Sequence, residues 1–115
     1  MGVVRGNFYG DVFDKNPKII RDEASDQYMI FNKLLAKRYD IMISFDLVGL
    51  YIAKEKNIAD QVKMLDYVID DQPTYVGFSK AKGDGAKQLA EKLSVTLEQL
   101  RKEGFMDKIR KKYLD

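Results

Sequence analysis

The residues best suited to chemistry lie where an apolar run meets the start of a predicted helix. Residues 41–43, Ile-Met-Ile, form the unbroken apolar run that is typical of a parallel strand covered on both faces. In open α/β sheets, ligands bind just beyond the carboxyl ends of such strands. We therefore expect any site to lie near residues 44–46, Ser-Phe-Asp. Asp46 can also cap the following helix, because its carboxylate can accept a hydrogen bond from a free backbone amide.

A second candidate site follows the first predicted strand, residues 2–5. The turn after it contains Gly6 and Gly10 and can open a helix over residues 11–13. Gly6 permits a positive φ angle or a close approach of a ligand to the backbone. Free amides at a helix start attract anions such as carboxylates. The same pattern fits an ordinary strand-to-helix turn, so the residues alone leave both interpretations open.

Composition excludes several kinds of active site. The chain has no cysteine and no histidine, which excludes disulfides, thiolate zinc sites and Ser-His or Cys-His catalysis within it. Asp70 and Asp71 form an acidic pair, but calcium requires about six or more oxygens, so we expect a solvated turn and no metal or cofactor. The net charge of +2 argues against a dedicated nucleic-acid surface. No apolar run approaches the ~20 residues of a membrane span.

The order of predicted elements is β-α-β-α-β-α-β-β-α-α, which indicates an α/β fold with a mainly parallel sheet flanked by helices. The strands are expected at residues 2–5, 18–21, 41–43, within 61–69, and at 74–79. The helices are expected at residues 11–13, from Ser25 or Asp26 to 38, from 47 to about 56, at 84–103 and at 105–114. Gly104 fits the left-handed residue that ends a helix.

The two last predicted helices carry an apolar stripe along one face. In the longer helix the stripe is formed by leucine and alanine side chains at helical spacing: Ala86, Leu89, Leu93, Leu97 and Leu100. Packing on a sheet is the expectation for such a stripe. A partner or membrane surface is the alternative. No signal peptide is recognisable, and the first strand begins almost at Met1, which suggests a truncated product.

Five segments in order resemble the second lobe and C-terminus of the family 3 extracellular solute-binding proteins, the receptors for polar amino acids in bacterial ABC importers. The segments are a strand and glycine turn, a strand preceded by a basic pair, its following helix, a hinge strand and the terminal helices. They read GVVRGNFY at 2–9, KRYDIMI at 37–43, DLVGLY at 46–51, YVGFSK at 75–80, and LEQLRKEG at 97–104 with I109 and KYL at 112–114.

The resemblance implies a type II periplasmic-binding-protein fold. Residues 1–71 would be a second-lobe α/β domain with part of the hinge. Residues 72–115 would be the hinge return strand and the C-terminal helices that complete a first lobe absent from this chain. The protein would bind a small amino-acid-like ligand without catalysis, carrying half of the binding site. It would work with an ABC permease in the periplasm or at the cell envelope.

The resemblance also implies which residues contact a ligand. The turn that offers amides and a small hydroxyl to the ligand carboxylate corresponds to Gly6, Asn7 and Phe8, where the family often has Thr or Ser. The position of the acidic residue that receives the ligand ammonium corresponds to Phe45, with Asp46 one residue later. Either Asp46 serves that role or the ammonium has no acidic partner here.

Two aromatic residues bear on the kind of ligand that is expected. If Phe45 faces the cleft, it and Tyr9 would form a wall that suits an apolar or cationic side chain.

The alternative functions are a sensory domain of the same fold and a dehydratase-like enzyme. One aspartate without histidine or metal is a poor catalytic set, which disfavours the enzyme. Without a first lobe, the terminal helices are expected to self-associate through their apolar stripe.

Overall fold

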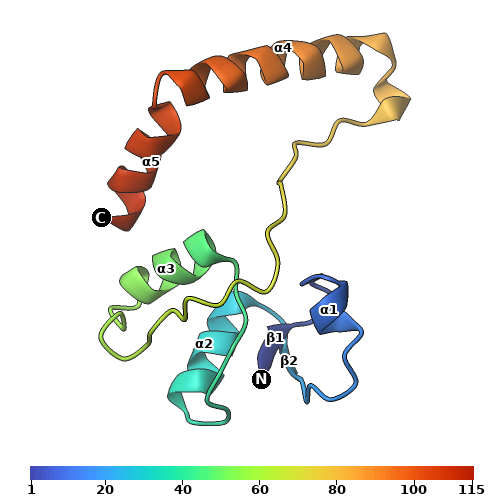
Figure 1. Cartoon of the computed structure of the whole chain (residues 1–115). Helices are drawn as coiled ribbons and strands as arrows, with labels where there is room; N and C mark the ends of the chain where they lie inside the picture. The colour runs from blue at the N-terminus through green and yellow to red at the C-terminus, as the bar shows by residue number, and fades with distance from the viewer. The chain divides into compact units, whose positions relative to one another are not determined.

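The computed structural model describes all 115 residues and shows an α/β protein with a small parallel sheet. The chain divides into two compact units, Met1–Asp71 and Gln72–Asp115, which we call unit 1 and unit 2 (Figure 1). Their identification as a second lobe and as part of a first lobe stays a prediction. The elements of unit 1 are β1 (Gly2–Val4), α1 (Asp11–Asp14), β2 (Asp22–Ala24), α2 (Gln27–Leu35) and α3 (Asp46–Glu55).

The sheet of unit 1 is built around β1. On one side β1 pairs in parallel with β2, with Gly2 opposite Asp22 and Val4 opposite Ala24. On the other side Gly2 makes an isolated parallel bridge to Met42. The Gly2 amide donates to the carbonyl of residue 41, and the Gly2 carbonyl accepts from the amide of residue 43, both at 2.9 Å. The first strand, rather than the 41–43 run, is therefore the centre of the sheet.

Helices cover both faces of this sheet. Successive residues of β1 point to opposite sides, so the strand has an apolar side chain to pack on each face. Val3 packs with Tyr9, Phe13 of α1 and Ile43 on one face. Val4 packs with Ala24 and Ile30 of α2 on the other face. Figure 1 shows the two strands between α1 and α2.

The helix α3 packs against α2 through a third apolar cluster. Phe31 of α2 meets Ile52, Ala53 and Ile58 there, and all four are buried. The Tyr28 hydroxyl adds a hydrogen bond of 2.5 Å to the Glu55 carboxylate across the two helices. The predicted cap of α2 is confirmed, because the Asp26 carboxylate accepts from the amide of residue 29 at 2.9 Å.

Unit 2 contains a 3-10 turn, η1 (Lys80–Lys82), and two helices, α4 (Asp84–Lys102) and α5 (Phe105–Leu114). Gly104 lies between the helices with φ of 73°, the left-handed conformation that the sequence predicts. No residue of unit 2 is buried. No helix of either unit is both long and apolar enough to cross a membrane.

Four of the predicted strands are wrong or shortened. The second strand lies at Asp22–Ala24, not at residues 18–21, and the 41–43 strand is reduced to the single bridge at Met42. Residues 61–69 and the predicted hinge return strand, 74–79, contain no strand. The mainly parallel sheet is thus only two-stranded.

The physical reason is that β-prone residues form a strand only beside another backbone edge. The apolar pair at 19–20 is preceded by a turn in which the Asn16 side chain accepts from the Lys18 amide, and Ile20 remains 86% exposed. In the 61–69 and 74–79 segments, Met64, Tyr67, Val68 and Tyr75 are all more than half exposed.

Candidate functional site

The two segments in which the sequence places a site lie at the same edge of the sheet. The chain leaves the sheet after Val4 into the Gly6 turn and after Met42 into residues 44–46. Because these segments run parallel, their carboxyl ends face the same edge. The N-terminus of α2 follows Ala24 at this edge as well. This is the edge at which open α/β sheets bind ligands.

The side chains of Tyr9 and Phe45 meet at this edge, with ring centroids 6.2 Å apart and planes inclined by 35°. Tyr9 is buried, its ring lies edge-on to Phe13 at 5.6 Å, and its hydroxyl accepts from the Val4 amide at 3.0 Å. Phe45 is 51% exposed. Of the expected aromatic wall, Phe45 therefore presents open surface, whereas Tyr9 belongs mainly to the core.

The turn after β1 presents backbone amides to solvent. Gly6 has φ of 80°, which glycine adopts without strain, and no atom lies within 4 Å of the position a Cβ would take there. The Asn7 amide donates to the Val4 carbonyl at 3.3 Å, which closes the turn. The exposed amides of Gly6 and Phe8 make no hydrogen bond within the protein. The Phe8 side chain is 54% exposed.

Asp46 is the first residue of α3. The N-cap is therefore Phe45, one residue before the Asp46 cap that the sequence predicts. The Asp46 carboxylate nevertheless accepts from the next amide, that of Leu47, at 2.7 Å. Its side chain is exposed, which leaves the second carboxylate oxygen open to solvent. Asp46 is thus an acceptor at the start of the helix, and its role as a ligand contact stays a prediction.

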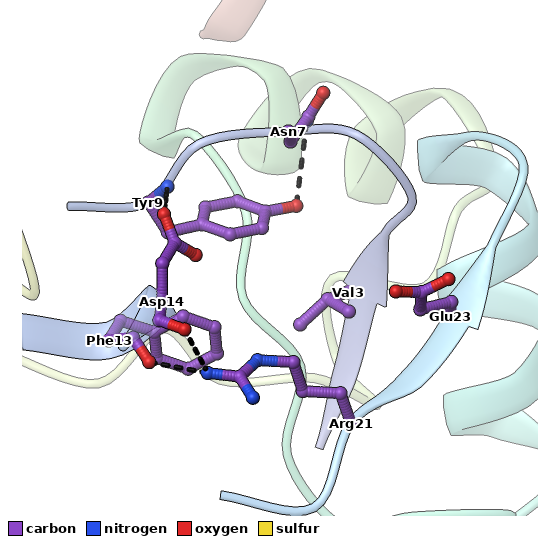
Figure 2. A pocket seen from close by; sticks show the side chains of 7 residues that line it. All are labelled: Val3, Asn7, Tyr9, Phe13, Asp14, Arg21 and Glu23. Carbon is purple, nitrogen blue, oxygen red and sulfur yellow. Dashed lines mark hydrogen bonds between the residues drawn. The ribbon is translucent and has the colours of Figure 1, made fainter. Parts of the chain in front are cut away.

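A cavity of about 270 Å³ lies next to the Gly6 turn (Figure 2). Its apolar side is formed by core residues and its polar side by a carboxamide, two carboxylates and a guanidinium. The lining residues are Val3, Asn7, Tyr9, Phe13, Asp14, Arg21 and Glu23. Asn7 and Tyr9 are therefore the two predicted site residues that reach this cavity, whereas Gly6, Phe8, Phe45 and Asp46 do not line it.

Arg21 fixes one wall of the cavity. Its Nη2 donates to the carbonyls of Phe13 at 2.5 Å and of Asp14 at 3.1 Å, as Figure 2 shows. These are carbonyls at the end of α1, where the helix dipole favours a cation. The guanidinium carbon also lies 5.1 Å from the centroid of the Phe13 ring. Arg21 therefore holds the C-terminal end of α1 and the residues that follow it in place.

Asp14 holds the turn that precedes α1. Its Oδ2 accepts from the Tyr9 amide at 2.9 Å. Glu23 faces the cavity from β2, and its Oε2 accepts from Nε of Arg5 at 3.1 Å. The sequence reasoning did not identify Asp14, Arg21 or Glu23, because it placed residue 21 inside a strand and treated 11–13 only as a helix start. No local pattern marks these residues, since their convergence depends on the β1–β2 pairing.

Comparison with known proteins assigns no family to the chain. No protein-family model, no curated protein and no solved structure matches it.

Proposed function

We propose that the chain is a non-enzymatic ligand-binding module that binds a polar amino acid or a similar small zwitterion. One observation carries this proposal: the two segments expected to contact the ligand meet at the carboxyl edge of the sheet, with Tyr9 and Phe45 in ring contact at 6.2 Å. Residues 9 and 45 are far apart in sequence, so the pairing of Gly2 in β1 with Met42 is what brings their segments together.

The polar groups at this edge suit the two charged ends of an amino acid. The amides of Gly6 and Phe8 point to no protein acceptor and can donate to a carboxylate. The second oxygen of the Asp46 carboxylate can accept from an ammonium group. Exposed Phe45 offers an apolar face beside them. This arrangement binds a ligand from one side only, which is the half-site that the family resemblance implies.

The resemblance extends the proposal to a wider context. In a family 3 solute-binding protein of an ABC importer, a first lobe would close over this half-site and the closed form would engage the permease in the periplasm or at the cell envelope. Unit 2 would supply the terminal helices of that lobe. In the chain as it stands, we propose that the uncovered stripe of α4 leads to self-association.

Titration of the 115-residue chain with L-amino acids, followed by NMR, tests the binding proposal. A ligand should shift the amide signals of Gly6, Phe8 and Asp46 together, in the millimolar range, because half a site offers few contacts. Asp46→Asn should weaken this binding, because it removes the charge that faces the ammonium.

The matched control is Asp40→Asn. Asp40 is also an exposed aspartate, but it precedes Met42 and therefore lies at the opposite edge of the sheet. Its substitution should leave the shifts unchanged. If no L-amino acid shifts the 6–9 and 44–46 signals, or if Asp40→Asn weakens binding as much as Asp46→Asn, the proposal is wrong. Turnover of any bound ligand would show an enzyme instead.

A further inference from the structure

We propose that the cavity beside Asn7 binds a cationic group, an ammonium or guanidinium, and so selects ligands with a basic side chain. The identity of the whole ligand, an amino acid, rests on the proposed function. The positive charge of the group that enters the cavity rests on the lining residues alone. Among the lining residues two carboxylates, each with one oxygen that makes no hydrogen bond in the protein, outnumber a single guanidinium whose Nη2 is engaged by main-chain carbonyls.

The occupied donor is Arg21. Its Nη2 contacts three main-chain carbonyls, those of Phe13, Asp14 and Asn16. Its Nη1 donates to a fourth, that of Ile19, at 3.4 Å. With the Phe13 ring beside it, the guanidinium is held in the wall of the cavity by these main-chain carbonyls, which fix its position.

The free acceptors come from three residues around the cavity. Asp14 uses only Oδ2, for the Tyr9 amide, and Glu23 uses only Oε2, for Arg5. The Asn7 side chain uses its nitrogen, in a long contact of 3.5 Å to the Tyr9 hydroxyl, and keeps its carbonyl oxygen. In Figure 2 the Asn7 side chain lies above the Tyr9 ring, and the Glu23 side chain lies to the right of Val3.

The ion pair of Glu23 with Arg5 does not close the site. The Arg5 side chain is 73% exposed and that of Glu23 is 49% exposed, and such a solvent-screened surface pair contributes little to stability. A ligand cation that enters the cavity can therefore share the Glu23 carboxylate with Arg5 or displace it. A carboxylate in the same place would face the two carboxylates of Asp14 and Glu23 and the single guanidinium of Arg21, so charge repulsion outweighs attraction.

The shape of the cavity fits a side chain rather than a whole ligand. Its volume of about 270 Å³ lies just below the roughly 300–1,000 Å³ of pockets that enclose complete small molecules. Val3, Tyr9 and Phe13 give it an apolar floor on which the methylene stem of a lysine or arginine side chain can lie. Asn7 belongs both to the cavity and to the amide turn at 6–8, which connects this subsite to the proposed carboxylate site.

The test compares L-arginine, L-lysine, L-glutamine and L-glutamate as ligands of the whole chain, by NMR titration at low salt. Methylguanidinium is added as a probe that has the cationic group but no carboxylate. We expect arginine and lysine to bind about tenfold more tightly than glutamine, glutamate to bind most weakly, and the signals of Asn7, Asp14 and Glu23 to respond to the basic ligands.

Glu23→Gln removes the charge from an exposed side chain and should lower arginine affinity several-fold while the protein stays folded. Asp14→Asn, which keeps an acceptor for the Tyr9 amide, should act in the same direction. The matched control is Asp11→Asn, because Asp11 lies on the same helix but pairs with Lys15 on exposed surface. The control should retain the arginine affinity of the unaltered chain.

The outcomes separate this inference from the proposed function. If glutamine or glutamate binds as tightly as arginine, or if Glu23→Gln leaves arginine affinity unchanged, the cationic subsite is wrong and amino-acid binding stands. If methylguanidinium binds in a Glu23-dependent way but no amino acid moves the Gly6 and Phe8 amides, the subsite stands and the proposed function is wrong. If none of the probes binds, both are wrong.

Discussion

Unit 1 and unit 2 differ in what their helices have to pack against. All eleven buried apolar residues of the protein lie in unit 1, between Val3 and Ile58. Unit 2 has the longest helix, α4, and a second helix of ten residues, but no buried side chain. In unit 1 a two-stranded sheet of six residues contributes to two apolar clusters, and a third cluster lies between α2 and α3.

The comparison shows that helix formation and side-chain burial have separate causes in this chain. The helices of unit 2 follow from local sequence: capable helix formers, a glycine that separates them and basic residues in each last turn. The core of unit 1 follows from non-local pairing of residues 2–4 with 22–24 and 42. Most helical stability in proteins comes from packing, so we expect unit 1 to be much more sensitive to substitution.

The largest expected contrast is between truncations in the two units. Ile52→Ala removes a side chain that is 2% exposed in the α2–α3 cluster, and should destabilise unit 1 by about 2–5 kcal/mol. Leu89→Ala acts on a side chain of α4 that is 57% exposed in the single chain, and at protein concentrations too low for self-association it should change stability by less than about 0.5 kcal/mol. Urea unfolding followed by NMR signals of each unit measures both. Equal losses would mean that the stripe of α4 is covered in solution.

A second contrast concerns two glycines. A Cβ on Gly2 would lie 2.3 Å from the ring of Tyr39, so Gly2→Ala should destabilise unit 1 by about 1–3 kcal/mol by overpacking the centre of the sheet. Gly77→Ala in unit 2 meets no atom within 4 Å and should be close to neutral. Thermal unfolding compares the two variants. A neutral Gly2→Ala would show that Tyr39 moves freely, against its 2.7 Å hydrogen bond to the Ile30 carbonyl.

A third contrast concerns two aspartates at helix starts. Asp26→Ala removes the carboxylate that accepts from the amide of residue 29, and should cost about 1 kcal/mol. Asp84→Ala removes a charge from the first turn of α4, where the cap is Gly83 and no side chain caps the helix. Its effect should be a few tenths of a kcal/mol, from the helix dipole alone. Amide hydrogen exchange in the first turns of α2 and α4 measures both effects.

The smallest expected effect is a pH dependence confined to unit 1. Lys33 Nζ lies 2.5 Å from Asp22 Oδ1, and this hydrogen bond holds the pKa of the Asp22 carboxyl below its usual value. Because the folded pKa is the lower one, the contribution is complete above the unfolded value of about 4 and is lost as pH falls through the folded value.

The measurement is the unfolding midpoint of unit 1 as the pH is lowered below about 4. Asp22→Asn should flatten the fall in stability over that range, because it removes the titrating carboxyl group. Lys33→Met should flatten it similarly, because it removes the donor that lowers the pKa of Asp22. A fall that is as steep in Asp22→Asn as in the unaltered chain would assign the acid sensitivity to other carboxylates.

Local sequence was enough to predict the helices, a cap at Ser25 or Asp26, the left-handed Gly104 and the glycine turn after the first strand. Each depends on residues within one or two turns of chain. The sequence also singled out the segments around Gly6 and Asp46, because a turn after a predicted parallel strand is recognisable locally.

Which β-prone segments form strands, and which polar residues come into contact, depends on the tertiary structure. The segments at 61–69 and 74–79 have strand-like composition but no neighbouring edge, whereas Asp22–Ala24, with two acidic residues, pairs with β1. That pairing brings Glu23 toward Asn7 and places Arg21 against the end of α1. The physical reason is that strand formation and site assembly depend on contacts between residues distant in sequence, which composition and spacing do not encode.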